Sequence, residues 1–431
     1  MPKVSVLMPS YNVAPYIRQS IDSVLGQTLQ DIEVICIDAG SEDGTLEIIR
    51  ERAEEDSRLM LLPSERKSYG FQMNLGIKQA RGEYIAIVET DDFAEADMLE
   101  RLCSLADAYE ADLVKSNYWE YRNGRKFFHE TLAGHPYDKL ICPGEDDPSL
   151  LKVSPSIWSA VYRRSWLLEQ GVDFLETPGA AYQDVSFAIK ALAASRRVVL
   201  CREAFLHYRR DNAGQSVRDG GKSHFLFDEF QAVEDFLVQR PELGKKLGEV
   251  IRQTKHAQFL TGKRRLKALE QAEFLIRVKE ELQREAANGE AALSLCWQQL
   301  MENTDEQIRM NAILQWQEQK MCVSGFWREL EGAGMIYLYG AGRVACLVKD
   351  CLAQRGFAPA GFLVTSLRDK KELEGIPLFE ASRLPLDCPG ILVLACVGDE
   401  KLPEVLGTLR ELHCSNYIAM NLELRQSLGA E

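Results

Sequence analysis

Residues 84–92 have the sequence YIAIVETDD, a short apolar run that ends in three carboxylates within four residues. The run Tyr84 to Val88 has the character of a buried strand. In open α/β folds, ligands bind at the carboxyl ends of the strands, which is where Glu89, Asp91 and Asp92 would lie. Carboxylates this close repel each other unless a cation lies among them, and such oxygen ligands suit Mg²⁺ or Mn²⁺ shared with substrate phosphates. These residues therefore predict a cation and phosphate site at a sheet edge.

The same residues allow a second interpretation, the start of a helix. Asp92 would then be the N-cap, Glu95 would occupy the capping-box position, and Ala96 to Leu105 would form the helix. In that case the carboxylates would accept hydrogen bonds from backbone N–H groups rather than bind a ligand. The residues at the ends of the neighbouring strands help to choose between a ligand site and a helix start.

Those neighbouring strands also end in side chains that suit a ligand. The first ~120 residues alternate strand and helix signals, which predicts a mostly parallel sheet covered by helices. Val4 to Met8 leads into Tyr11, and Glu33 to Ile37 closes on Asp38. Because parallel strands end at one edge of a sheet, these side chains and the acidic cluster would surround one cleft. Such a cleft suits a nucleotide diphosphate, with a ring for the base, acids for the ribose hydroxyls and a cation for the phosphates.

The totals describe a globular protein of two or three domains. Of the 431 residues, 46% are hydrophobic and 27% are charged, and the net charge of −14 argues against duplex nucleic acid as a partner. No apolar run approaches the ~18 residues of a membrane span, and the chain enters a strand at once, so we expect no signal peptide. The eleven cysteines show no CxxC pair, so we expect reduced core thiols, no zinc and a cytoplasmic protein.

Several short motifs in the first half of the chain occur in a familiar order and spacing. They are PSYN (9–12), SVLGQT (23–28), IDAGSEDGT (37–45), NLGI (74–77), GEYI (82–85) and ETDD (89–92). In these motifs the chain resembles family 2 glycosyltransferases. The resemblance implies a GT-A (nucleotide-diphospho-sugar transferase) fold, a nucleotide-sugar donor, a divalent metal (Mg²⁺ or Mn²⁺) and inversion at the anomeric carbon.

The resemblance also implies roles for the residues at the strand ends. Pro9 and Tyr11 would contact the nucleotide, with Tyr11 against the base. Asp38 matches the first acid of the family's paired-acid turn, Asp91 would contact the ribose or the metal, and Asp92 would hold the metal near the diphosphate.

Two departures from the family pattern stand out in this part of the chain. Ala39 replaces a second acid that often contacts the base, which weakens the case for uracil, and Met73 replaces a common arginine. Asp38 could instead be a turn acid that accepts from neighbouring backbone N–H groups.

A second decisive stretch runs from Pro178 to Phe187, where a Gly-rich loop leads into Asp184 and a helix from Val185 to Ala194. In the resembled family this aspartate is the catalytic base. Its neighbour, usually an acid, is Gln183 here, and a neutral neighbour would raise the pKa of the base less than a second carboxylate would. The alternative role for Asp184 is a helix N-cap, which is compatible with a base.

Residues near the acceptor and the donor phosphates are less distinctive. Gln183 and Trp158 would face the acceptor, although Trp158 is equally consistent with a core residue. Arg209, followed by Gln215-Ser216, resembles a Tyr-Arg and Ser pattern in a loop over the donor phosphates, and its planar fork suits a diphosphate. The alternative for Arg209 is a surface cation pair.

Beyond residue 220 the pattern changes twice. Residues 221–331 show helical spacing of apolar residues, and residues 245–267 form a basic stretch that suits either a solvated helix face or an anionic membrane surface or lipid-diphosphate acceptor. Residues 332–431 begin with a strand, Met335 to Tyr339, and the turn GAGRVA (340–345), which indicate a Rossmann-like α/β module. The second strand there ends in Thr365-Ser366 without an acid for a ribose, so this module is either ligand-binding or structural.

We therefore predict a GT-A domain at 1–220, a helical region at 221–331 and a Rossmann-like domain at 332–431. The predicted activity is metal-dependent, inverting transfer of a sugar from a nucleotide diphosphate to a glycan or glycolipid hydroxyl, in surface polysaccharide or glycolipid synthesis. The protein would be cytoplasmic, with contact to the inner face of the membrane through residues 245–267 as an open alternative. The rivals are a nucleotidyltransferase and a catalytically weak nucleotide-sugar-binding or scaffold protein, for which Ala39 and Gln183 would be the argument.

Overall fold

A computed structural model describes residues 1–212, 220–287, 295–367, 371–388, 390–414 and 416–428. The chain falls into two compact units, Met1–Ala292 and Leu293–Glu431, and each is described by itself. The predicted division into three parts at 220/221 and 331/332 stays a prediction.

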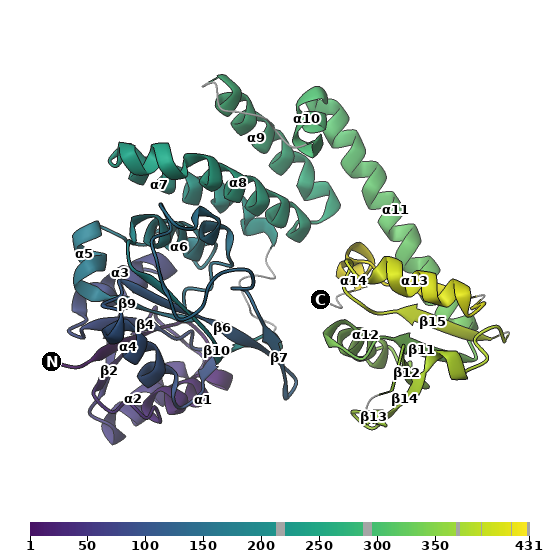
Figure 1. The fold of residues 1–431 in the computed structure, drawn as a ribbon, viewed down its shortest axis with the longest axis horizontal. Helices are drawn as coiled ribbons and strands as arrows, with labels where there is room; N and C mark the ends of the chain where they lie inside the picture. The colour runs from purple at the N-terminus through teal and green to yellow at the C-terminus, as the bar shows by residue number, and fades with distance from the viewer. Residues whose placement is uncertain (213–219, 288–294, 368–370, 389, 415, 429–431) are drawn as a thin grey trace. The chain divides into compact units, whose positions relative to one another are not determined.

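The first unit is built on a ten-stranded mixed sheet (Figure 1). Its strands are β1 (Val4–Ser10), β2 (Ile32–Asp38), β3 (Leu59–Pro63), β4 (Tyr84–Ile87), β5 (Phe93–Ala94), β6 (Leu113–Arg122), β7 (Arg125–His129), β8 (Leu140–Ile141), β9 (Ala160–Arg163) and β10 (Val198–Arg209). The main path is β3-β2-β1-β4-β9-β6-β10-β5, and β7 and β8 pair with β6 and β10.

The first four strands of this path form the predicted parallel sheet. β1 pairs in parallel with β2 and β4, and β3 adds to β2 in parallel. Every residue of β1, β2 and β4 is buried, as expected for strands with both faces covered. Ser10 is paired with Asp38 in the register, so the ends of β1 and β2 lie side by side. The expected edge at which strands end in polar residues is therefore present.

Helices cover this sheet. They are α1 (Ala14–Leu25), α2 (Thr45–Glu55), α3 (Tyr69–Gln79), α4 (Met98–Ala108), α5 (Arg164–Gln170), α6 (Gln183–Ala194), α7 (Phe225–Val238), α8 (Pro241–Arg265) and α9 (Ala268–Ala287). The helices α7 and α8 pack against α6, which brings the region after residue 220 onto the first unit (Figure 1).

The second half of the sheet departs from the parallel arrangement. β9 pairs antiparallel with both β4 and β6. β10 runs from Val198 to Arg209 and follows β6 in parallel. Between β6 and β7, Asn123 and Gly124 both have positive φ angles, as a two-residue hairpin turn of this type requires.

A network of buried charges joins α7, α8 and α9. Lys255 lies at its centre, donates to Glu234 and Glu281 at 2.8 and 2.7 Å and forms an ion pair with Glu285 at 2.6 Å, while His256 contacts Glu285 at 2.8 Å. Burial lowers the pKa of Lys255, but the three carboxylates raise it above its ordinary value overall. An ammonium group surrounded by acids in this way fixes three helices to one another.

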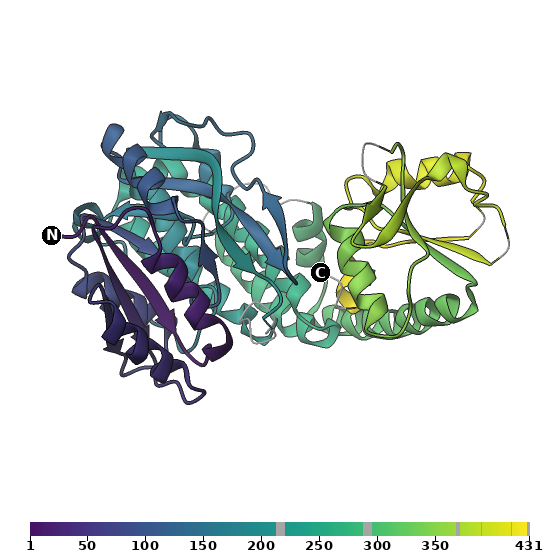
Figure 2. The ribbon, with the colours of Figure 1, turned by 90° about the horizontal axis from the view of Figure 1, so that it is seen from below.

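The second unit contains a six-stranded sheet in the order β13-β14-β12-β11-β15-β16, parallel except for β13. Its strands are β11 (Met335–Tyr339), β12 (Gly361–Val364), β13 (Glu372–Leu373), β14 (Ile376–Glu380), β15 (Ile391–Ala395) and β16 (Tyr417–Ala419). Its helices are α10 (Leu295–Glu302), α11 (Asp305–Gly332), α12 (Arg343–Ala353), α13 (Leu402–Glu411) and α14 (Leu422–Leu428). Helices cover both faces of this sheet (Figure 2).

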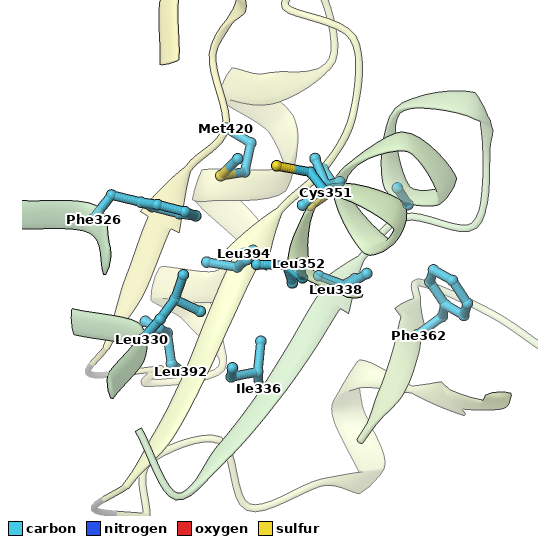
Figure 3. Close-up of a cluster of buried hydrophobic side chains, with 13 residues drawn as sticks. Phe326, Leu330, Ile336, Leu338, Cys351, Leu352, Phe362, Leu392, Leu394 and Met420 are labelled. Carbon is cyan, nitrogen blue, oxygen red and sulfur yellow. The ribbon is translucent and has the colours of Figure 1, made fainter. Parts of the chain in front are cut away.

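Two apolar clusters, one on each face, hold the second unit together. One contains Leu338 and Leu394 from the central strands with Leu352 of α12 and Phe326 and Leu330 of α11 (Figure 3). The other contains residues of the same strands that point the opposite way, packed on α13. This is the Rossmann-like arrangement that the strand and turn signals predict.

Two further expectations concern the whole described chain. None of its helices combines the length and apolar character needed to cross a membrane. The ten cysteines whose side chains the structure describes are free thiols, and Cys36, Cys201 and Cys396 are buried as expected.

Candidate active site

A cavity of about 450 Å³ lies in the first unit, at the edge of the sheet where β4 ends. The segment after β4, the segment before β9, the start of α6, the end of β10 and the last turns of α8 all contribute to its wall. Glu89, Asp91 and Asp184 line it together, although Asp184 is far from the other two in the sequence. The cavity is large enough for part of a sugar nucleotide or an acceptor.

Asp184 is the second residue of α6 and faces this cavity. The N-cap position is occupied by Tyr182, with φ of 64°, so the alternative that Asp184 is the N-cap is wrong. Burial raises the pKa of Asp184 to about 6, against the opposing effects of the Arg265 charge, the N–H groups of Asp184 and Val185, and Lys115. A carboxyl group with this pKa is ionised near neutral pH and is more basic than an ordinary aspartate, as a general base requires.

Glu89, whose role the sequence does not indicate, also lies in the cavity wall. Its Oε1 accepts a hydrogen bond from the Tyr69 hydroxyl at 2.6 Å. Burial raises the pKa of Glu89 to about 8, and the Asp91 and Asp184 charges add to the rise, while the Tyr69 hydrogen bond opposes it. Glu89 and Asp91 therefore face the same space as Asp184.

In the turn after β4, the Asp91 side chain faces the cavity and the Asp92 side chain is buried. Asp91 lines the cavity and accepts from Asn212 Nδ2 at 2.9 Å. Asp92 is 1% exposed, its Oδ1 accepts from the Arg209 backbone N–H at 2.7 Å, and its Oδ2 has no hydrogen-bond partner in the described chain. Burial, with the Asp91 charge next, raises the pKa of Asp92 well above the ordinary value.

The helix-start interpretation of this turn is wrong. Asp92 is followed by the strand residues Phe93–Ala94 of β5, and the helix α4 begins later, at Met98 after the cap residue Asp97. The carboxylates after β4 therefore do not serve a helix N-terminus.

Asp91 and Asp92 suit a divalent cation that takes few of its ligands from the protein. No group of three or more His, Cys, Asp and Glu side chains in the described ranges could hold a metal ion unaided. An unpartnered Asp92 oxygen beside Asp91 instead suits an ion bound through one or two carboxylates, which completes its coordination with waters and substrate phosphates. Asp91 and Asp92 are the residues that would hold Mg²⁺ or Mn²⁺.

On the proposed nucleotide side, the predicted residues lie along the ends of β1 and β2. Asp38 is 2% exposed and accepts from the Ser10 and Ser41 hydroxyls and from the Gly40 and Ser41 N–H groups, at 2.7–2.9 Å. This is the geometry of the turn-acid alternative. Tyr11 is 45% exposed and its hydroxyl accepts from Lys67 Nζ at 2.8 Å, while the same ammonium group lies over the ring, 4.5 Å from its centre. Pro9 is buried, and its carbonyl accepts from Thr90 at 2.7 Å, so it ties β1 to the acidic turn. The nucleotide roles of these three residues stay predictions.

Arg210, and not the predicted Arg209, lies in the cavity wall. Arg209 is 7% exposed, donates to the Asp91 carbonyl at 2.7 Å and to Gln19 at 2.6 Å, and is not part of the cavity wall, so it is not a surface cation. The side chain of Arg210 lines the cavity instead and contacts the Tyr208 hydroxyl at 3.4 Å. Gln215 and Ser216 lie outside the described residues.

The predicted acceptor residues are both in the cavity wall. Trp158 is 8% exposed and stacks on Tyr208 with ring centroids 5.1 Å apart, so it combines a core position with an edge at the cavity. Gln183 donates to Thr177 Oγ1 at 2.7 Å and accepts from the Ala181 N–H at 2.5 Å, which holds the loop before α6. Their contact with an acceptor stays a prediction.

Sequence analysis missed two cations near Asp184. Lys115 on β6 is 5% exposed and donates to the Ser156 carbonyl and hydroxyl at 2.5 and 2.8 Å, which supports the wall segment before β9. Arg265, the last residue of α8, lines the cavity with its guanidinium carbon 5.2 Å from the centre of the Tyr182 ring. A lysine inside an apolar strand was the available signal for Lys115, whereas no local pattern distinguishes Arg265 from its basic neighbours.

Neighbouring acids neutralise the first half of the basic stretch 245–267. Lys245 pairs with Glu242, Lys246 with Glu145, and Arg252 with Glu249, in addition to the buried network around Lys255. Lys263, Arg264 and Lys267 form no ion pair with any side chain in the described ranges. The free positive charge of the stretch is therefore concentrated at the end of α8.

Comparisons with known proteins agree with these features. Residues 5–169 match the sequence model of the family described as glycosyl transferase family 2. Over 216 residues the chain is 29% identical to the uncharacterized glycosyltransferase EpsJ of Bacillus subtilis (strain 168), which is 49% of this chain and 62% of that protein. Over 213 residues it is 33% identical to the putative glycosyltransferase EpsH of the same organism, 48% of this chain and 61% of that protein.

The chain thus spans about three fifths of the length of these Bacillus relatives. Among solved structures, S. aureus TarS 1–349 in complex with UDP-GlcNAc is 18% identical and aligns with a TM-score of 0.43 over 68% of this chain and 93% of that one. The predicted fold, a GT-A-type mixed sheet followed by helices and a second, smaller sheet, is confirmed. Residues 5–169 of this chain are thus similar in sequence to glycosyl transferase family 2.

Proposed function

We propose that this protein transfers a sugar from a nucleotide diphosphate to a hydroxyl group of a glycan or glycolipid, with inversion at the anomeric carbon, in surface polysaccharide or glycolipid synthesis. The observation that carries the proposal is the meeting of Asp184 with Glu89 and Asp91 in one cavity beside the family motifs. A base and a phosphate-binding edge on one cavity are the two parts that a single displacement needs.

The proposed reaction is one in-line displacement. The ionised Asp184 carboxylate accepts the proton of the acceptor hydroxyl, and the hydroxyl oxygen attacks the anomeric carbon from the face opposite the nucleotide diphosphate. The bond from that carbon to the diphosphate oxygen breaks as the new glycosidic bond forms, and the electron pair leaves with the diphosphate. A divalent cation bound at Asp91 and Asp92 would supply charge neutralisation on the leaving diphosphate.

Other residues of the cavity would orient the two substrates. The Trp158 and Tyr208 rings offer an aromatic edge against which a sugar can lie. Arg210 is the arginine placed to meet an anionic part of the donor, a role that the sequence suggested for Arg209.

The test is release of nucleotide diphosphate from a panel of nucleotide sugars with Mn²⁺, with and without simple glycoside acceptors. We expect release with one donor class, stimulated by an acceptor, and an inverted anomeric configuration in the product by NMR. Formation of pyrophosphate from a nucleoside triphosphate would support the nucleotidyltransferase instead. Donor binding without turnover under any condition would support the scaffold alternative.

We also propose that the end of α8, with Lys263, Arg264 and Lys267, contacts an anionic membrane surface or a lipid-diphosphate acceptor at the inner face of the membrane. Their lack of acidic partners in the described chain supports this placement. Replacement of all three by Gln should abolish cosedimentation with anionic liposomes, while the matched variant Lys245→Gln with Lys246→Gln should bind like the unchanged protein. Equal binding to neutral and anionic liposomes would refute it.

A further inference from the structure

Four basic residues of α8 form ion pairs with acids, namely Lys245, Lys246, Arg252 and Lys255, whereas Arg265 forms none in the described chain. Its side chain lines the cavity with Asp184, and its guanidinium carbon lies 5.2 Å from the centre of the Tyr182 ring. Within the described chain it forms no ion pair and donates no hydrogen bond. Arg265 is a solvent-exposed residue whose side chain also lines the cavity, so its guanidinium can act on what the cavity contains.

Several acidic groups lie around Asp184. Glu89 and Asp91 approach from the turn after β4, and Tyr69 on α3 binds Glu89. Glu229 on α7 is fully buried against α6 and interacts electrostatically with Asp184. Burial raises the pKa of Glu89 and of Glu229 to about 8, above the value of about 6 for Asp184, so both are largely protonated where Asp184 ionises. Burial is therefore the main effect that opposes the ionisation of Asp184.

Three cations lie near Asp184, and they differ in how far they can offset the effect of burial on its ionisation. Lys115 on β6 uses its ammonium group to hold Ser156 and Ser159, and burial lowers the pKa of Lys115 to about 7, so it loses its charge near neutral pH. Arg210, directly after β10, lies near Glu120, at 3.9 Å, and Tyr208. Arg265 on α8 keeps its charge at every working pH, and among the groups near Asp184 its effect on the pKa of that residue is the largest that favours the ionised form.

We propose that Arg265 is a positioning residue, which holds the catalytic Asp184 in its ionised form and makes α8 a part of the active site. This rests on the proposed function for its catalytic meaning, but the electrostatic link between α8 and α6 exists whatever the reaction is. It also gives the helical region after residue 220 a role that the family match over residues 5–169 does not cover.

The first test measures the link without any turnover. Asp184→Asn should raise the melting temperature at about pH 8, because a buried carboxyl group with a raised pKa destabilises the fold when it is ionised. Arg265→Gln should lower the melting temperature at about pH 8, lower it clearly less in the Asp184→Asn background, and lose this difference at about pH 5, where Asp184 is protonated in either protein. An equal effect of Arg265→Gln in both backgrounds at about pH 8 would overturn the proposal.

The second test uses the rate of nucleotide diphosphate release. Arg265→Gln should move the acid limb of the pH profile to higher pH by roughly half a unit or more, and Arg265→Lys should restore most of the shift. The matched control is Lys245→Gln, which removes an exposed charge from the same helix and should leave the profile unchanged. If Arg265→Gln lowered the rate equally at every pH, a pH-independent structural role would replace the proposed one. If the unchanged protein released no nucleotide, the proposed function would fail, and the melting experiment would still decide the role of Arg265.

Discussion

Both sheets of this protein end a central parallel strand in a turn, but the two turns are built in different ways. After β4 the turn carries Glu89, Asp91 and Asp92, and it meets Asp184 and Arg265 from elements far along the chain. After β11 the turn is made of Gly340 and Gly342, and α12 starts with no acidic residue in its first turn. The first turn depends on distant partners for its chemistry, whereas the second depends on its own backbone. The same position in two α/β sheets can therefore be either a site or a connection, and local sequence separates the two only in part.

The largest expected effect on turnover comes from replacing Asp184, the proposed base in the first of these two regions of the molecule. Asp184→Asn should lower turnover by about 10²–10⁴-fold, because the amide cannot accept the acceptor proton. Nucleotide binding should persist, as measured by calorimetry with nucleotide diphosphate and Mn²⁺. Normal turnover by this variant would show that the base lies elsewhere.

Removal of the cation-binding carboxylate should have the next largest effect. Asp92→Asn should lower turnover roughly 10²-fold and weaken the dependence of nucleotide binding on Mn²⁺. Since Asp92 is a buried carboxyl group with an unpartnered oxygen, the variant should also melt at the same temperature as the unchanged protein or higher. The matched control is Asp97→Asn at the start of α4, which should bind nucleotide and Mn²⁺ normally. Mn²⁺-dependent binding that survives in Asp92→Asn would remove this residue from the metal site.

The pH dependence should follow Asp184 with a definite sign. Its pKa is raised to about 6, so below that pH the group is protonated and cannot act as a base. The rate should therefore fall about tenfold per pH unit below about pH 6 and level off above it. A profile of nucleotide release against pH measures this directly, and a limb near the ordinary aspartate value would contradict the raised pKa.

The smallest effect should come from the second turn. Gly340 has φ of +120°, and a Cβ there would lie 2.6 Å from the Cys396 carbonyl oxygen, so Gly340→Ala should destabilise the second unit by about 1–3 kcal/mol. Denaturant unfolding followed by the fluorescence of Trp327, which packs on the core of that unit, would report it. Turnover should stay normal, and a loss of activity without a loss of stability would mean that this turn is also a site.

The parallel half of the first sheet was predictable because its strands are buried on both faces and end in recognisable residues such as Asp38 and Asp91. The rest depended on information that is not local. β9 is antiparallel between β4 and β6, which a four-residue strand cannot reveal. Arg210 rather than Arg209 lines the cavity, because successive side chains of an extended segment point to opposite faces and the register at the end of β10 decides which one reaches it.

The position of Arg265 could not be predicted from local sequence either, because it depends on packing between helices. It lies in a run of three basic residues, Lys263 to Arg265, and only the packing of α8 on α6 and α7 brings one of them beside Asp184. The Rossmann-like unit was predictable in outline, since GAGRVA follows a strand and opens a helix.

The charged network around Lys255 has a practical meaning for dividing this protein into fragments. An N-terminal fragment that stops at residue 267 would keep Lys255 and Glu234 but lose Glu281 and Glu285 of α9. An ammonium group that is 4% exposed in the intact unit would then face water where two carboxylates had been, and the end of α8 would lose its anchor. The shortest fragment expected to keep the cavity complete therefore extends through Ala287, far beyond the end of the family match at residue 169.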